Sequence, residues 1–157
     1  MSCPTRAVKL ACVGIIIALA SAACGGAAGS KALRVIKDDP LASESVAGTS
    51  LINRSEKKGG GTFFKATGEQ PTLSLNFLPV DGRGANLLQA FADRARGAGW
   101  EVGPLTDGSF AATRVRDGYR LSARVSERDP GGPAGAAIGA PSDAWTVLVR
   151  ISAGRMN

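Results

Sequence analysis

The sequence predicts an α+β fold: a small, mostly antiparallel sheet of four or five strands, with one helix packed on one face. Residues 119–125 alternate strictly between apolar and polar side chains, and residues 145–151 repeat the pattern. Such alternation is typical of strands that bury one face. Residues 85–98 instead repeat apolar side chains at helical spacing. Together these patterns predict a sheet with one covered face and one open face.

The first strand of this sheet is expected to end at Pro79. Its inward side chains are Leu73, Leu75 and Phe77, and its outward ones are Ser74 and Asn76. A turn over residues 81–84 then leads into the predicted helix.

The predicted helix carries one apolar stripe. The stripe consists of Leu87, Leu88, Phe91, Ala92 and Ala95. Asp93 and Arg96 lie three residues apart on the polar side, where they can form an ion pair. Gly97 and Gly99 are expected to end the helix in left-handed conformations. Trp100 is then expected to fold back over that end.

Further strands are expected after the helix. They are residues 100–103, 109–115, 119–125 and 145–151, with a turn at residues 107–108. In the last two strands the inward side chains are Tyr119, Leu121, Ala123, Val125, Trp145, Val147, Val149 and Ile151. The loop from Glu127 to Asp143 is long for so small a domain. Such loops are either functional or disordered, and the composition of its middle favours disorder.

The turn after residue 115 allows two strand registers. A two-residue Asp-Gly loop places Arg114 opposite Leu121, on the core face. A three-residue loop with Gly118 left-handed places Thr113 opposite Leu121 and Arg114 opposite Arg120. The second register keeps arginine out of the core, and it is therefore the one we predict.

Composition excludes several kinds of chemistry. The chain has no histidine, which removes Ser-His-Asp and Cys-His mechanisms. Its cysteines are Cys3, Cys12 and Cys24, so a mature chain that begins at Cys24 cannot build a zinc site on Cys or His. The carboxylates are scattered, with no spaced cluster for calcium. We therefore expect no catalytic residues, no metal and no cofactor.

One short motif matches an enzyme pattern. Residues 55–58 read Ser-Glu-Lys-Lys, as in the S-x-x-K motif of penicillin-recognising enzymes. In those enzymes the serine begins a buried helix, whereas Ser55 lies in a polar segment that ends in three glycines. The chain is also too short for that fold. The match is attributed to chance, and no enzyme is expected.

The N-terminus has the order of a secretory signal. Arg6 and Lys9 are followed by an apolar run from Leu10 to Ala20, then by small residues ending in Cys24. This run resembles the lipobox of bacterial lipoproteins. The composition rich in Ala, Gly and Arg, together with the helix end at residues 95–100, resembles small lipoproteins of high-GC Gram-positive bacteria. The resemblance implies cleavage before Cys24 and a diacylglyceryl group on its sulfur. The protein is then anchored by lipid on the outer face of the cell membrane.

Two alternatives remain for this segment: an ordinary secretory signal, and an uncleaved transmembrane helix. A span needs about 20 predominantly apolar residues, whereas the strongly apolar part stops at Leu19. The expected organisation is a signal peptide at residues 1–23, a tether and spacer at residues 24–61, and the α+β domain at residues 62–157. Within the spacer, Asp39 can cap a helical turn that Pro40 opens. One short element is expected near residues 50–54, and residues 55–61 read as a loop.

Arginines mark one candidate binding surface. Arg114, Arg120, Arg124 and Arg150 are all expected on the sheet face away from the helix. Guanidinium groups bind phosphate and carboxylate groups well. The simpler interpretation, which the sequence favours, is a solvated outer face, because the exposed side of an antiparallel sheet is normally polar.

The formal charge of +6 includes Arg6 and Lys9 of the signal, so the mature chain is mildly basic. That balance suits anionic lipid or wall polymer and is no nucleic-acid signature. The leading hypothesis is a non-catalytic envelope lipoprotein that binds or tethers an unidentified partner, for which an envelope protein and an anionic polymer are both candidates. The second is a module that binds anionic wall polymer or lipid headgroups through the arginine face. A flat apolar patch favours the first, and a concave apolar cavity beside the sheet favours the second.

Overall fold

The structure is a computed structural model, and it describes residues 24–60, 69–80, 87–129, 141 and 144–156. Six strands form one antiparallel sheet in the spatial order β1-β2-β6-β5-β4-β3. The strands are β1 (Thr49–Lys57), β2 (Thr72–Pro79), β3 (Glu101–Val102), β4 (Ser109–Arg116), β5 (Tyr119–Arg128) and β6 (Thr146–Arg155). The helical segments are α2 (Cys24–Lys37), the 3-10 turn η1 (Pro40–Ala42) and α3 (Leu87–Gly97). The α+β class is confirmed, with six strands where four or five were predicted.

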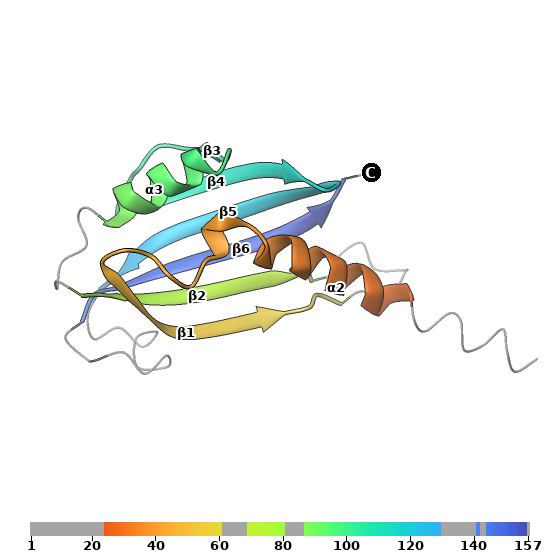
Figure 1. The fold of residues 1–157 in the computed structure, drawn as a ribbon, viewed down its shortest axis with the longest axis horizontal. Helices are drawn as coiled ribbons and strands as arrows, with labels where there is room; N and C mark the ends of the chain where they lie inside the picture. Colours follow the sequence, from red (N-terminus) through yellow and green to blue (C-terminus); the bar gives the residue numbers. More distant parts are fainter. Residues whose placement is uncertain (1–23, 61–68, 81–86, 130–140, 142–143, 157) are drawn as a thin grey trace, which may run out of the picture.

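All of these helical segments lie on one face of the sheet (Figure 1). The strands direct alternate apolar side chains to that face, as predicted for β2, β5 and β6. The buried inward residues include Leu73, Leu75, Phe77, Leu121, Val125, Val149 and Ile151. They form one core with the helices, in which the Phe77 and Phe91 rings lie 5.4 Å apart. The opposite face of the sheet carries no helix among the described residues, and we call it the open face.

Helix α3 carries the predicted stripe and ends largely as predicted. Leu88, Phe91, Ala92 and Ala95 are buried, and Arg96 pairs with Asp93 at 2.7 Å. The Trp100 backbone N–H donates to Ala95 O, and the Gly99 N–H donates to Arg96 O. These bonds, with Gly99 at φ +80°, make a Schellman end. The prediction of a second left-handed glycine was wrong, since Gly97 remains helical.

The turn between β4 and β5 differs from the predicted one in loop length and strand register. Asp117 (φ 51°) and Gly118 (φ 79°) both have positive φ, which is the two-residue type I′ geometry. Arg114 therefore lies opposite Leu121, on the helix-covered face. The predicted three-residue loop was wrong because it was chosen to keep arginine out of the core. An acid on the same face makes that placement stable, as described below.

The segment predicted to be a tether and spacer, residues 24–61, also differs from the prediction. From Ala32 onward it belongs to the folded core, where Leu33, Ile36 and Leu41 are buried. Helix α2 also packs closely on the chain just after β1, because a Cβ at Gly29 would lie 2.4 Å from the Lys58 carbonyl oxygen. The expected cap is confirmed, since the Asp39 side chain accepts from the Leu41 N–H at 2.9 Å.

Strand β1 forms one edge of the sheet and is longer than the short element expected near residues 50–54. It pairs with β2, and its register shifts between Leu51 and Asn53. Residues 55–57, expected in a loop, are its last residues. At the other edge, β3 contains only Glu101 and Val102. Trp145, expected inside the last strand, precedes β6 and is half-buried.

Several expectations lie outside the described residues. These are the signal peptide at residues 1–23, the turn at residues 81–84 and most of the loop at residues 127–143. Within the described ranges, no helix combines the length and apolar character required to cross a membrane.

Candidate functional site

The covered face holds a buried carboxylate with several donors around it. Asp39 is 2% exposed. Its Oδ1 accepts from the Leu41 N–H and from Trp100 Nε1 at 3.0 Å, and its Oδ2 accepts from an Arg114 Nη at 2.8 Å. Arg116 approaches the same Oδ2 to 3.8 Å. This Asp39 cluster explains how Arg114 can sit beside the core, and it removes Arg114 from the predicted arginine face.

Other basic residues on the covered side also have partners. Lys37 lies 2.8 Å from Glu56, and Arg54 pairs with both Glu44 and Glu56. Arg94 donates to the carbonyl oxygens of Pro40 and Ser45. Hydrogen bonds from Lys37 and then Arg54 lower the pKa of Glu56 below its ordinary value of 4.5. The charges of these basic residues are therefore locally compensated.

The open face differs in this respect. Its outward cations are Lys57, Arg120, Arg124, Arg128 and Arg150. Within the described ranges, none of their side chains makes an ion pair or a hydrogen bond. Arg124 and Arg150 are direct cross-strand neighbours. Glu101, beside Thr113 at the edge, is the one acid that the described strands place on this face.

One hollow of the open face is a groove across β1, β2 and β6, which we call the β1–β2–β6 groove. It has a volume of about 450 Å³ and is lined by Asn53, Ser55, Lys57, Thr72, Ser74, Asn76, Arg128, Leu148 and Arg150. Hydroxyl and amide groups therefore stand between cations. Asn76 is only 4% exposed, and its Oδ1 has no hydrogen-bond donor in the part of the chain described.

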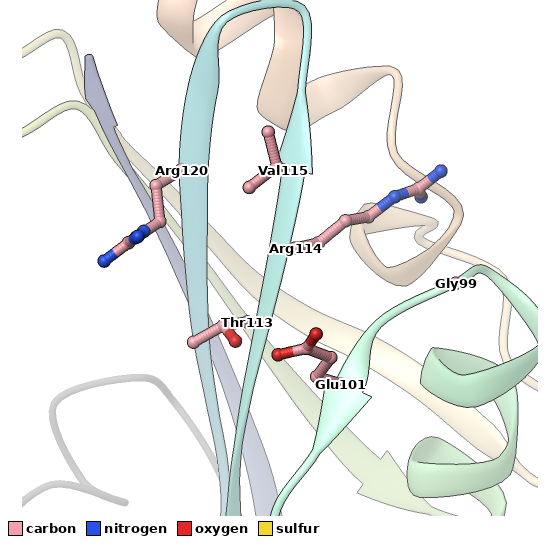
Figure 2. Close-up of a pocket in the computed structure, with 6 residues that line it drawn as sticks. All are labelled: Gly99, Glu101, Thr113, Arg114, Val115 and Arg120. Atoms are coloured by element: carbon pink, nitrogen blue, oxygen red, sulfur yellow. The ribbon is translucent and has the colours of Figure 1, made fainter. Parts of the chain in front are cut away.

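A second hollow of about 460 Å³ lies at the β3–β4–β5 end. Figure 2 shows that Arg114 and Arg120, which both line it, point away from each other on opposite sides of the sheet. Glu101 and Thr113 lie beside each other on the open face, the side to which Arg120 points (Figure 2). This hollow therefore does not bring the two arginines to one ligand.

Glu127 is a further group that the sequence did not single out. It lies near the end of β5, and its Oε1 is buried without a hydrogen-bond partner within the described residues. Burial, and then the charge of Asp129, raise the pKa of Glu127 above its ordinary value of 4.5. Glu127 is not among the described residues that line these surface hollows.

Four large apolar side chains are exposed in the described residues. Val80, Leu105, Val115 and Met156 come from separate segments. The described ranges also contain no group of acids and cysteines spaced to hold a metal ion.

The structure thus divides the predicted site residues. Arg120, Arg124 and Arg150 share the open face, whereas Arg114 does not. Arg128 was missed, although the alternation of β5 continues to it. Cys24, the predicted site of lipid attachment, is the first residue of α2. No family model matches the chain, and neither does any curated protein or solved structure.

Proposed function

We propose that this protein is a lipid-anchored component of the bacterial cell envelope that acts by binding, with an anionic polymer or headgroup held on its open face. The anchor is proposed on the signal pattern that ends in Cys24. The binding role is proposed on the contrast between the two sides of the sheet. Lys37, Arg54 and Arg114 of the covered side have partners, whereas the outward cations of the open face have none within the described residues.

The observation that carries the proposal is the Arg124–Arg150 pair. The two residues are direct neighbours across β5 and β6, and like charges placed directly opposite destabilise a sheet. A phosphate or carboxylate between them would remove this repulsion and accept charge-assisted hydrogen bonds from both guanidinium groups. Binding an anion therefore relieves an unfavourable feature of the free protein.

The tethering of a protein partner has less support. That hypothesis calls for a contiguous apolar patch, and only four large apolar side chains are exposed in the described residues. The hollows of the open face are lined mostly by polar and charged residues, which suits a charged and hydroxylated ligand.

The anchor is tested with Cys24→Ala, using membrane fractionation and the intact mass of the extracted protein. We expect the native protein to have the mass of residues 24–157 plus a diacylglyceryl group, and the variant to be unprocessed or released from membranes. An unchanged mass and unchanged membrane retention in the variant would reject the lipid anchor.

The binding face is tested by reversing Arg124 and Arg150 together to glutamate in the detergent-solubilised protein. We expect loss of binding to anionic vesicles and to anionic wall material, and weaker binding of the wild type at high salt. The matched control reverses Lys31 and Arg34, exposed cations of α2 that make no ion pair within the described residues, for the same change in net charge. Equal losses in both variants on soluble wall polymer would mean that net charge alone attracts the ligand.

A further inference from the structure

The β1–β2–β6 groove contains an unsatisfied polar group as well as cations. Asn76 lines the groove, is 4% exposed, and has an Oδ1 without a donor in the described residues. A buried acceptor without a donor is unfavourable and rare in folded proteins. A native side chain in this state is therefore a candidate for a bond that a ligand completes.

The missing partner must be a hydrogen-bond donor. Phosphate and carboxylate groups that are ionised only accept hydrogen bonds, so an anion alone cannot satisfy Asn76 Oδ1. A ligand hydroxyl is a donor of the required kind. The neighbouring Asn53 and Ser74 line the same groove and offer further polar groups to a hydroxylated ligand.

The cations of the groove indicate that the ligand also carries an anionic group. Arg150 and Arg128 line it, and Arg124 lies directly beside Arg150 on the next strand. Ser74 is the cross-strand neighbour of Arg150 on the other side. Asn76 pairs with Leu148, two residues from Arg150, so Asn76 and Arg150 are diagonal neighbours about 7–8 Å apart, a separation that a sugar ring with an anionic substituent can span.

From these two requirements we infer that the β1–β2–β6 groove binds a sugar or cyclic polyol that carries a carboxylate or a phosphate. Arg150, with Arg124 and Arg128, holds the anionic group, and Asn76 accepts from a ring hydroxyl. The inference rests on the proposed anion-binding function and adds to it the requirement for hydroxyl groups. The ligand unit can belong to a wall polysaccharide or to a lipid headgroup.

The test measures the affinity of the detergent-solubilised full mature protein for three soluble polymers. Polygalacturonate offers carboxylates and hydroxyls, polyphosphate offers charge without hydroxyls, and dextran offers hydroxyls without charge. We expect the wild type to bind polygalacturonate more tightly than polyphosphate at matched charge, and dextran only weakly. Equal affinity for polygalacturonate and polyphosphate would overturn the inference.

The variant Asn76→Leu identifies the group responsible. We expect roughly a tenfold loss of affinity for polygalacturonate, the size of one hydrogen bond, with little change for polyphosphate. The variant should fold, because it removes an unsatisfied buried group; if it does not, Ser74→Ala serves as a second variant with a smaller expected loss. Thr113→Val, which removes a hydroxyl of the open face outside the groove, is the matched control and should change neither affinity.

Arg150→Gln separates the two levels of the argument. We expect it to weaken binding of both polygalacturonate and polyphosphate. If Arg150→Gln lowers both affinities and Asn76→Leu lowers neither, the hydroxyl requirement is wrong and the proposed anion-binding face stands. If Arg150→Gln changes neither affinity, both proposals fail.

The source of the ligand is distinguished with vesicles of equal charge. One preparation contains phosphatidylinositol, whose headgroup is a hydroxylated ring, and the other contains phosphatidic acid, whose headgroup has no hydroxyl outside the phosphate. A preference for phosphatidylinositol that Asn76→Leu abolishes would assign the groove to a lipid headgroup. An Asn76-dependent preference seen with polygalacturonate alone would assign it to a wall polymer.

Discussion

The two faces of the sheet carry arginines in opposite situations. On the covered face, Arg114 donates to the buried Asp39 carboxylate at 2.8 Å. On the open face, Arg124 and Arg150 are neighbours and neither has an anionic partner within the described residues. An arginine next to a core is tolerated only with a partner, because an unpaired charge there is strongly unfavourable. In solvent the same requirement disappears, so the open face is free to keep its charge for a ligand.

The largest expected effect on stability comes from disrupting the Asp39 cluster on the covered face. Asp39→Ala removes the η1 cap, the acceptor of Trp100 Nε1 and the partner of Arg114 together. We expect a loss of about 3 kcal/mol in the free energy of unfolding, measured by urea denaturation. Asp38→Ala is the matched control, because Asp38 is exposed and accepts only through its backbone oxygen.

A double variant refines this first prediction. Asp39→Leu combined with Arg114→Leu should recover part of the loss, since replacing both members of a buried pair by apolar residues is tolerated better than removing one. A loss below about 0.5 kcal/mol in Asp39→Ala, the size typical of an ordinary surface substitution, would contradict the role given to the Asp39 cluster.

A smaller effect of opposite sign is expected on the open face. Arg124→Glu places a carboxylate opposite Arg150 and should raise the free energy of unfolding by roughly 0.2–1 kcal/mol. Added salt should stabilise the wild type by screening repulsion and should destabilise the variant. Thermal denaturation at low and high salt measures both. Arg120→Glu is the matched control, because the residue opposite Arg120 on β6 is Gly154, which carries no charge.

The smallest effect is expected at the rim of the covered side. Because the pKa of Glu56 is lowered, its ion pairs stabilise the fold above pH 4.5, and the contribution is lost as pH falls through the lower folded-state pKa. Glu56→Gln should cost a few tenths of a kcal/mol at neutral pH, as exposed pairs do. The difference from wild type should vanish in acid, when the native carboxyl is protonated. Glu101→Gln is the matched control at neutral pH, because the Glu101 carboxylate makes no ion pair among the described residues.

Patterns confined to neighbouring residues were predictable. The apolar stripe of α3 and the alternation of β5 and β6 follow directly from side-chain periodicity. The end of α3 was also readable, since Gly99 and Trp100 supply the left-handed residue and the apolar contact that a Schellman end requires. In each case the residues that determine the structure are close together in the chain.

The predictions that were wrong concern structure that depends on contacts between residues far apart in the sequence. The register of the β4–β5 turn depends on Asp39, which is 75 residues from Arg114, and no local pattern reveals that pair. Strand β1 lacks the apolar alternation of a half-buried strand because Arg54 and Glu56 occupy inward positions next to α2. The groove was missed for the same reason, since its residues come from strands that become neighbours only in the sheet.

The edge position and register shift of β1 also bear on how copies of this protein meet. An edge strand exposes backbone N–H and C=O groups that can pair with another chain and start aggregation. The irregularity between Leu51 and Asn53 interrupts that template, and Lys57 places an exposed positive charge on it. At the other edge, β3 is too short to recruit a partner strand. Molecules crowded side by side are thereby kept from joining their sheets into a continuous fibre.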